Sequence, residues 1–238
     1  MGRAHEVRAA SMAKTAAIKS KLYSIYAKEI YQAAKSGGTN PDANPALKRL
    51  IEKAKKEQVP SDVINRSIDK VNKGVTEDYT TVEYEGFGPG GSTLIVKCLT
   101  DNVNRTLTYV RTAMTKSGAK MAAQGAVSYM YEHLCAVGFE NGNEEEVLEL
   151  MIENDINVND IEVEDDILTI YAEPSELFKI KKALESKYGE IKYEIDEIAK
   201  FAKEMVTLQG EDREKFDRCI KALEDVEDVQ NIYHNVQN

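Results

Sequence analysis

The chain has 238 residues, 42% hydrophobic and 30% charged, which is typical of a globular protein with an ordinary core and one to three domains. No stretch approaches the roughly 18 consecutive apolar residues of a membrane-spanning helix. The first 20 residues lack the apolar segment of a secretory signal. Arg3, Arg8 and Lys14 would suit a mitochondrial transit peptide, but Glu6 argues against one. We therefore expect a cytoplasmic protein with no membrane partner.

The net charge of −10 conceals an asymmetry along the chain. Residues 1–75 contain 15 basic and 7 acidic residues, a net charge of +8, whereas the rest contains 16 basic and 34 acidic residues, a net charge of −18. A basic segment joined to an acidic one is a cue for nucleic-acid binding at the basic end.

Residue types that carry catalysis or bind metals are sparse. Cys98, Cys135 and Cys219 form no CxxC pair, so we expect small buried side chains in a reducing compartment. The three histidines have unrelated spacings, and no catalytic triad or HExxH motif occurs. The acidic runs at 144–146 and 162–166 are predicted to face solvent, with divalent-metal binding as the lesser alternative. We expect no enzyme activity, metal, cofactor or small-molecule substrate.

The basic segment is predicted to form three helices. Apolar residues at helical spacing indicate a first helix over 16–35, ended by Gly37 and Gly38. Asn44 and Pro45 predict the N-cap and first turn of a second helix. A third begins near Pro60 and ends at Gly74. These helices predict a small domain over residues 1–76.

After Thr76 the pattern changes to alternating strands and helices. Strands are predicted at 80–86 and 92–100, and a helix runs from Asp101 or Asn102 to Gly118. The elements predicted next along the chain are a strand over 126–139 with a possible break near Glu132, a helix at 144–153, a hairpin over 161–172, a helix at 175–187 and a strand at 190–195. The last six elements, from the strand over 126–139 onward, have the order βαββαβ of a ferredoxin-like unit.

The tail predicts a helix at 211–224 and a strand at 228–233. These two elements can complete the sheet that begins at Thr80. We therefore predict an α+β protein in which the N-terminal three-helix domain is followed by two α/β domains. The middle domain comprises 77–132 plus 198–238, and the acidic ferredoxin-like unit, 133–197, is inserted into it. A simple linear order of domains is the alternative.

Basic side chains on the three helices are the main binding candidates. Several Lys and Arg on one face hold a phosphate backbone by displacing its condensed counterions, although lysines also decorate ordinary solvated helices. Tyr23, Tyr26 and Tyr31 either stack on bases or pack in the core. The nucleic-acid-binding candidates are Lys19, Lys21, Lys28, Lys35, Lys48, Arg49, Lys53, Lys55, Lys56 and Arg66.

Two loops supply further candidates. YEGFGPGG at 84–91 is rich in glycine, but it lacks the Lys-Ser/Thr of a P-loop and leads into a strand. A hairpin loop with positive φ is therefore favoured over a phosphate cradle. In DNVNRT, 101–106, capping accounts for Asp101 or Asn102, whereas Asn104 and Arg105 together suit a phosphate or an RNA base edge. The loop candidates are Tyr84, Gly86, Phe87, Gly88, Gly90, Gly91, Asn102, Asn104 and Arg105.

These blocks, taken in order, resemble the YebC/PmpR family of probable transcriptional regulatory proteins. The matching pieces are PDANPALKRLIEKAK at 41–55, VPSDVINRSIDK at 59–70, YEGFGPGG at 84–91, DNVNRTL at 101–107, GAVSYMYE at 125–132 and ALEDVEDVQNIYHN at 222–235. EIYQAAKSGG and VSYMYE look closer to the YeeN-like branch. The resemblance covers about residues 18–236 and implies three domains, the third set into the second, with no known enzyme activity.

The resemblance implies two roles: sequence-specific DNA binding in transcription, and action at the ribosome, including relief of stalls at proline runs. Mitochondrial relatives are translational activators. Family members usually open with a basic stretch containing a Lys-Trp pair; this chain has no tryptophan, which puts any contact through that arm in doubt. We narrowly favour a DNA-binding transcriptional regulator, with a ribosome-associated factor that binds ribosomal RNA as the alternative.

Overall fold

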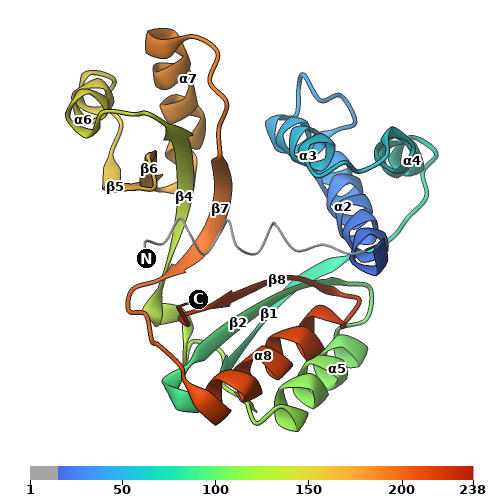
Figure 1. Cartoon of the computed structure of the whole chain (residues 1–238). Coiled ribbons are helices and arrows are strands. Elements are labelled where there is room, and N and C mark those ends of the chain that lie inside the picture. Colours follow the sequence, from blue (N-terminus) through green and yellow to red (C-terminus); the bar gives the residue numbers. More distant parts are fainter. Residues whose placement is uncertain (1–15, 238) are drawn as a thin grey trace.

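A computed structural model describes residues 16–237, whose elements form a helical unit and two sheets with their own helices (Figure 1). The helical unit contains α2 (Ala16–Gly37), α3 (Pro45–Lys56) and α4 (Ser61–Asn72). Asn44 joins the first two: its Oδ1 accepts the N–H of Leu47 at 3.1 Å, and its Nδ2 donates to the carbonyls of Ala33 and Gly38. One buried asparagine therefore caps α3 and fixes the turn after α2.

Apolar stripes from all three helices meet in one core. Its fully buried members come from α2, α3, α4 and the α3–α4 connection: Tyr26, Ile30, Ala34, Leu47, Ala54, Val59 and Ile64. Tyr31 is also buried, and its hydroxyl donates to the carbonyl of Val75. Tyr23 packs against the same core. Of the two roles considered for these tyrosines, the structure therefore shows packing.

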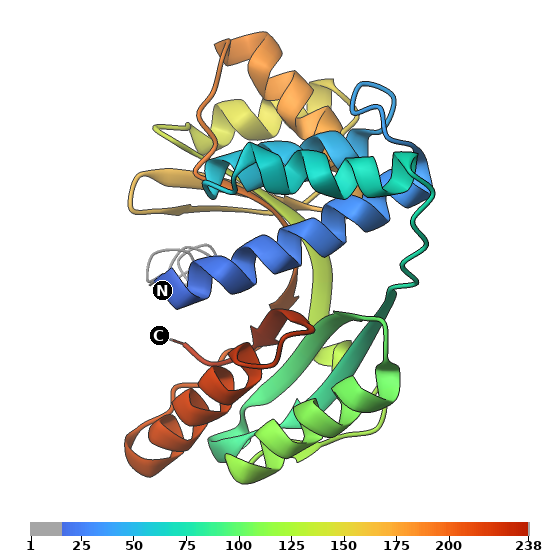
Figure 2. The ribbon, with the colours of Figure 1, turned by 90° about the vertical axis from the view of Figure 1, so that its right-hand side faces the viewer.

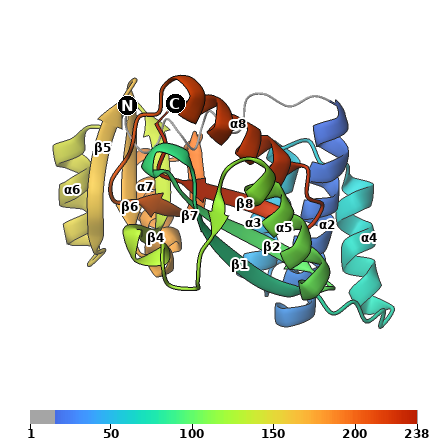
Figure 3. The same cartoon turned by 90° about the horizontal axis from the view of Figure 1, so that it is seen from below.

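The strands of the middle sheet come from the chain segments before and after a long insertion. Its strands are β1 (Thr80–Phe87), β2 (Thr93–Thr100), β3 (Lys120–Met121) and β8 (Val229–His234), in the antiparallel order β3-β1-β2-β8. Helices α5 (Val103–Lys116) and α8 (Gly210–Glu224) cover one face of this sheet (Figure 3). Leu94, Val110, Phe216 and Leu223 lie in the core between them.

The inserted segment is a ferredoxin-like unit, as the sequence predicted. Its strands follow the antiparallel order β5-β6-β4-β7, and both helices pack on one face. Its elements are β4 (Tyr131–Glu140), α6 (Glu144–Glu153), β5 (Val158–Glu164), β6 (Ile167–Ala172), α7 (Leu177–Tyr188) and β7 (Ile195–Ala202). This confirms the α+β class and the nested order. The domain limits at 76, 132 and 197 stay a prediction, because β4 and β7 extend past the last two.

Two local predictions were wrong, and one short strand was missed. The strand predicted at 190–195 begins only at Ile195, because the Tyr193 side chain turns toward α7 and its hydroxyl contacts the Lys181 carbonyl at 3.3 Å. The strand predicted over 126–139 begins at Tyr131 and shows no break near Glu132. The short strand β3 was not predicted, since a two-residue strand has no readable alternation.

A buried carboxylate explains why residues 125–130 form a turn. The side chain of Glu85, 6% exposed, accepts the backbone N–H groups of Gly125, Val127 and Ser128. Burial acts to raise the pKa of Glu85, but these backbone hydrogen bonds outweigh it and lower the pKa. The segment is thus held in a turn by a charge that lies some 40 residues away in the sequence.

No helix between Ala16 and Gln237 is long and apolar enough to cross a membrane. The hypotheses about the basic N-terminal arm, with Arg3, Arg8 and Lys14, concern residues outside the described part of the chain.

Candidate nucleic-acid interface

Four of the ten basic candidates have exposed side chains that make no hydrogen bond or ion pair within residues 19–237. Lys48, Lys55 and Lys56 lie on α3, and Lys19 lies near the start of α2. Lys55 and Lys56 belong to the last turn of α3, where cations also stabilise the helix dipole. These four lysines are the part of the predicted face that is open to a polyanion.

The other six candidates contact groups of the protein itself. Lys35 binds Asp78 at 2.8 Å, which raises the pKa of its amine, and Arg66 makes an exposed pair with Asp62 one turn earlier at 3.4 Å. Such exposed pairs contribute little and open readily. Lys21 donates to the carbonyls of Glu224 and Val226 near the end of α8, and its burial lowers its pKa. The charge count therefore overstated the free basic surface.

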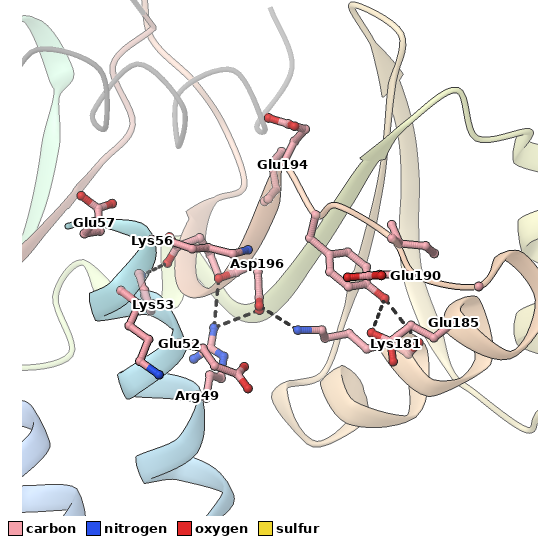
Figure 4. Close-up of a pocket in the computed structure, with 16 residues that line it drawn as sticks. Arg49, Glu52, Lys53, Lys56, Glu57, Lys181, Glu185, Glu190, Glu194 and Asp196 are labelled. Atoms are coloured by element: carbon pink, nitrogen blue, oxygen red, sulfur yellow. Dashed lines mark hydrogen bonds and ion pairs between the residues drawn. The ribbon is translucent and has the colours of Figure 1, made fainter. Parts of the chain in front are cut away.

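Arg49 and Lys53 of α3 reach the edge strand β7 of the ferredoxin-like unit (Figure 4). Arg49 Nη2 lies 3.2 Å from the carbonyl oxygen and 3.5 Å from Oδ1 of Asp196, and Lys181 Nζ of α7 lies 2.9 Å from Oδ2. Lys53 Nζ lies 2.5 Å from Glu197 Oε2. Burial acts to raise the pKa of Asp196, but Lys181 and Arg49 outweigh it and lower the pKa.

A cavity of about 720 Å³ separates α3 from β7 and α7. Its walls carry charges of both signs, with Lys55 and Lys56 on one side and Glu185 and Glu190 on the other. Figure 4 shows Arg49 of α3 and Lys181 of α7 pointing toward Asp196 of β7 from opposite sides. The contact between the helical and ferredoxin-like units is therefore polar around an open space.

The DNVNRT motif surrounds a buried carboxylate that sequence analysis did not single out. Asp228, 3% exposed, accepts from Arg105 Nη2 at 2.9 Å, Thr106 Oγ1 at 2.8 Å and Lys28 Nζ at 3.0 Å. Burial acts to raise its pKa, but these donors outweigh it and lower the pKa. Arg105 also binds Asp101 at 2.7 Å. Arg105 and Lys28 thus connect α5 and α2 to the residue that precedes β8. Figure 2 shows α2 (blue) above the turn between α8 and β8 (dark red).

Within the same motif, Asn102 is the N-cap of α5, because its side chain accepts the N–H of Arg105 at 3.0 Å. Asn104 is exposed on the first turn. Of the four polar candidates named in this motif, only Asn104 has a side chain that faces solvent and neither caps a helix nor pairs with a group of residues 16–237.

The glycine loop packs against the start of α8. Gly90 and Gly91 have φ of 61° and 81°, as expected for this hairpin, and a Cβ on Gly90 would lie 2.5 Å from Leu208. The carboxylate of Asp212 is also beside Gly90. Gly88 N–H and Ser92 N–H are already bonded within the loop. An acidic neighbour and occupied donors do not suit a phosphate cradle.

The remaining loop candidates are placed on β1. Gly86 is buried where a Cβ would lie 3.0 Å from the Lys120 carbonyl, and Tyr84 packs in the core with its hydroxyl on the Val103 carbonyl. Phe87 is 44% exposed. Phe87 pairs with Thr93 and Thr80 with Thr100, so the glycine loop and DNVNRT lie at opposite ends of an eight-residue strand, about 25 Å apart. The structure does not bring the two loops into one site.

A second basic surface escaped the sequence analysis. Helix α5 is the one α-helix between Ala16 and Gln237 that has no acidic residue. Arg111 and Lys116 of α5, and Lys120 of the adjoining β3, are exposed and form no ion pair among the described residues, and Tyr109 is 54% exposed. The sequence does indicate this surface, because the 14 residues of α5 contain no acidic residue although they belong to a segment of net charge −18.

Groups of three or more His, Cys, Asp or Glu placed to hold a metal ion do not occur within residues 16–237. Cys98, Cys135 and Cys219 are buried, unpaired with one another, and burial raises the pKa of each thiol, to about 12, 11 and 11. Thiols of this kind are poor nucleophiles and poor metal ligands at neutral pH.

Comparison with known proteins matches the whole chain. Residues 3–74 match the TACO1/YebC protein N-terminal domain, and residues 79–236 match the TACO1/YebC second and third domain. A probable transcriptional regulatory protein of Alteromonas mediterranea is 48% identical over 99% of this chain and 98% of its own. One of Shewanella oneidensis is 49% identical over 100% of this chain and 99% of its own.

A solved structure has the same architecture. The crystal structure of the conserved hypothetical protein Aq1575 from Aquifex aeolicus superposes with a TM-score of 0.77 at 35% identity, covering 94% of this chain and 92% of that one. With both sets of family domains matched in order and relatives of nearly equal length, the chain belongs to the TACO1/YebC family.

Proposed function

We propose that this protein is a cytoplasmic, non-enzymatic regulator of gene expression that binds DNA through its helical unit. The observation that carries the proposal is the set of exposed lysines Lys19, Lys48, Lys55 and Lys56, which make no ion pair within residues 19–237. The name carried by the Alteromonas and Shewanella relatives supports a role in transcription.

The distribution of charge fixes how a polyanion approaches. Residues 131–202, which form the ferredoxin-like unit, contain 20 acidic and 6 basic residues, a net charge of −14. A phosphate backbone is repelled by that unit and attracted to α3, where lysines displace condensed counterions. The helical unit is therefore the end of the molecule that meets nucleic acid.

The test is a triple charge reversal, Lys48→Glu, Lys55→Glu and Lys56→Glu. Binding to a promoter fragment and to an unrelated duplex is measured over a salt series. Because each lost phosphate contact lowers the slope of log K against log salt by about one, the variant should lose about three units of slope and more than tenfold in affinity.

A matched control reverses three exposed lysines elsewhere, Lys182, Lys203 and Lys221. It changes the net charge equally, so an equal loss of affinity in this variant would contradict a site on α3. Circular dichroism of both variants separates unfolding from lost binding. Equal affinity of the wild type for both DNA fragments would argue against transcription, because phosphate contacts carry no sequence information.

One observation favours a ribosome-associated translation factor as the second candidate. The four open candidates are all lysines, whereas Arg, Asn and Gln are the side chains that read base edges in pairs of hydrogen bonds. Lysines that contact only phosphate suit ribosomal RNA equally well. A pull-down with nuclease treatment, followed by identification of the bound DNA or ribosomal RNA, decides between the two. Co-sedimentation with ribosomes that the triple reversal abolishes would support translation.

A further inference from the structure

The two units that meet at Arg49 and Lys53 have separate hydrophobic cores. The apolar cluster of the helical unit contains side chains only from residues 22–71, and the cluster of the ferredoxin-like unit on the α6–α7 face only from 135–198. What joins α3 to β7 is the ion pairs around Asp196 and Glu197, beside the 720 Å³ cavity. Contacts of this polar kind between domains of one chain resemble transient interfaces, which open and close.

Asp196, on the acidic side of this contact, keeps an ion-pair partner when the contact opens. Asp196 is bound from within its own unit by Lys181 at 2.9 Å, in addition to Arg49. Moving α3 away therefore leaves Asp196 with a cation, and only Glu197, whose side chain is 29% exposed, loses its partner Lys53. An uncompensated carboxylate is costly when it is fully buried, and Glu197 is not. Arg49 is less well satisfied in the closed form, because its Nε is buried and has no hydrogen-bond partner.

Phosphate oxygens and carboxylate oxygens are alternative partners for the same guanidinium and ammonium groups. We propose that β7 is an intramolecular competitor for the nucleic-acid site on α3, through a latch made of Arg49, Lys53, Lys181, Asp196 and Glu197. In the closed form Asp196 and Glu197 occupy Arg49 and Lys53, and Lys55 and Lys56 face the acidic wall of the cavity. Nucleic acid binds tightly only when the units separate. This inference rests on the function proposed above.

The deciding variant is Asp196→Asn with Glu197→Gln, which removes both negative charges and keeps the side-chain shapes. The apparent dissociation constant equals the intrinsic one divided by the fraction of molecules in the open form. If the wild type is open about a third to a tenth of the time, the variant should bind about threefold to tenfold more tightly than the wild type. The probes are a labelled duplex DNA of about 30 base pairs and a single-stranded RNA of about equal length.

The control is Glu149→Gln with Glu153→Gln, which removes two exposed acids of the same unit on α6, away from β7. Both variants change the net charge of the ferredoxin-like unit equally. Tighter binding by the latch variant than by this control supports the latch, and equal binding by the two overturns it.

Opening is measured without nucleic acid as well. Spin labels at Asn65→Cys on α4 and Ser186→Cys on α7, both exposed, report the distance between the units. The distance should lengthen in the latch variant, and to a smaller extent in the wild type at about 0.5 M salt, because partly buried ion pairs such as Arg49–Asp196 and Lys53–Glu197 are screened less than exposed ones. An unchanged distance in both overturns the latch. If the distance lengthens but neither the wild type nor a variant binds the DNA or the RNA, the proposed function is refuted. The ion pairs then remain a salt-sensitive contact between the two units.

Discussion

Replacing Asp228 by alanine removes the carboxylate at which α2, α5, β2 and β8 meet. Removing one partner of a buried ion pair costs about 3–5 kcal/mol. Here Arg105 is 39% exposed and keeps Asp101, which reduces the loss. Lys28 is only 14% exposed and keeps the exposed Glu227 at 3.9 Å and the ring of Tyr79 at 5.8 Å. The hydroxyls of Thr100 and Thr106 bond each other at 2.8 Å and stay satisfied. We expect a loss of about 2–4 kcal/mol in the free energy of unfolding.

Urea unfolding followed by circular dichroism at pH 7 measures this loss, and hydrogen exchange of the β2 and β8 amides locates it in the middle sheet. The matched control is Glu227→Ala, because Glu227 is 79% exposed and should contribute less than about 0.5 kcal/mol. If Asp228→Ala unfolds within that margin of the wild type, the carboxylate does not hold these elements together.

The same carboxylate predicts a pH dependence. Since the folded state lowers the pKa of Asp228, its stabilising effect is complete above the unfolded value of about 3.9 and is lost as pH falls through the lower folded value. The difference in stability between the wild type and Asp228→Ala should therefore be constant from pH 7 to about pH 5 and shrink below about pH 4. A difference that grows on acidification would contradict the assigned charge state.

Three further outcomes are expected. Glu85→Gln should cost about 1–3 kcal/mol and speed proteolysis at residues 122–130, because an amide oxygen cannot replace a carboxylate that accepts three N–H groups; unchanged cleavage would refute this. Burial lowers the pKa of His234 to about 4, so wild-type stability should fall by up to about 3 kcal/mol between pH 6.5 and 4, and His234→Gln should flatten that slope in urea titrations. Gly90→Ala should lower the melting temperature more than Gly91→Ala, since both have positive φ but only Gly90 lies against Leu208; equal shifts would rule out that contact.

The fold was largely predictable because its helices and strands are strongly periodic. The Asn44–Pro45 cap and the turn at Asp165 follow from local patterns. The return of the last strand to the sheet that begins at Thr80 was predicted from the order of the elements, without its partner strand β2. The failures lie where a distant side chain overrides the local pattern, as Glu85 does at residues 125–128. Periodicity contains no information about a partner 40 residues away.

The candidate site was less predictable for the same reason. A count of charges treats every lysine as free, yet Lys28 is bound by Asp228, 200 residues later, and Arg49 by Asp196, 147 residues later. Only the tertiary fold shows which cations remain open. The acid-free composition of α5 was visible in the sequence, but a net charge counted over residues 76–238 averages it with the acidic residues that surround it.

The nested middle sheet has a consequence for the order in which a nascent chain acquires structure. Strand β2 lies between β1 and β8, and β8 ends only at His234, four residues before the last residue of the sequence. The helical bundle and the inserted unit have complete cores of their own once residue 202 is made, whereas β2 keeps an unpaired edge until β8, Val229–His234, is made. The middle sheet thus matures after the helical bundle and the inserted unit, and a ribosome that stops short of β8 releases a chain with an open sheet edge, a known template for aggregation.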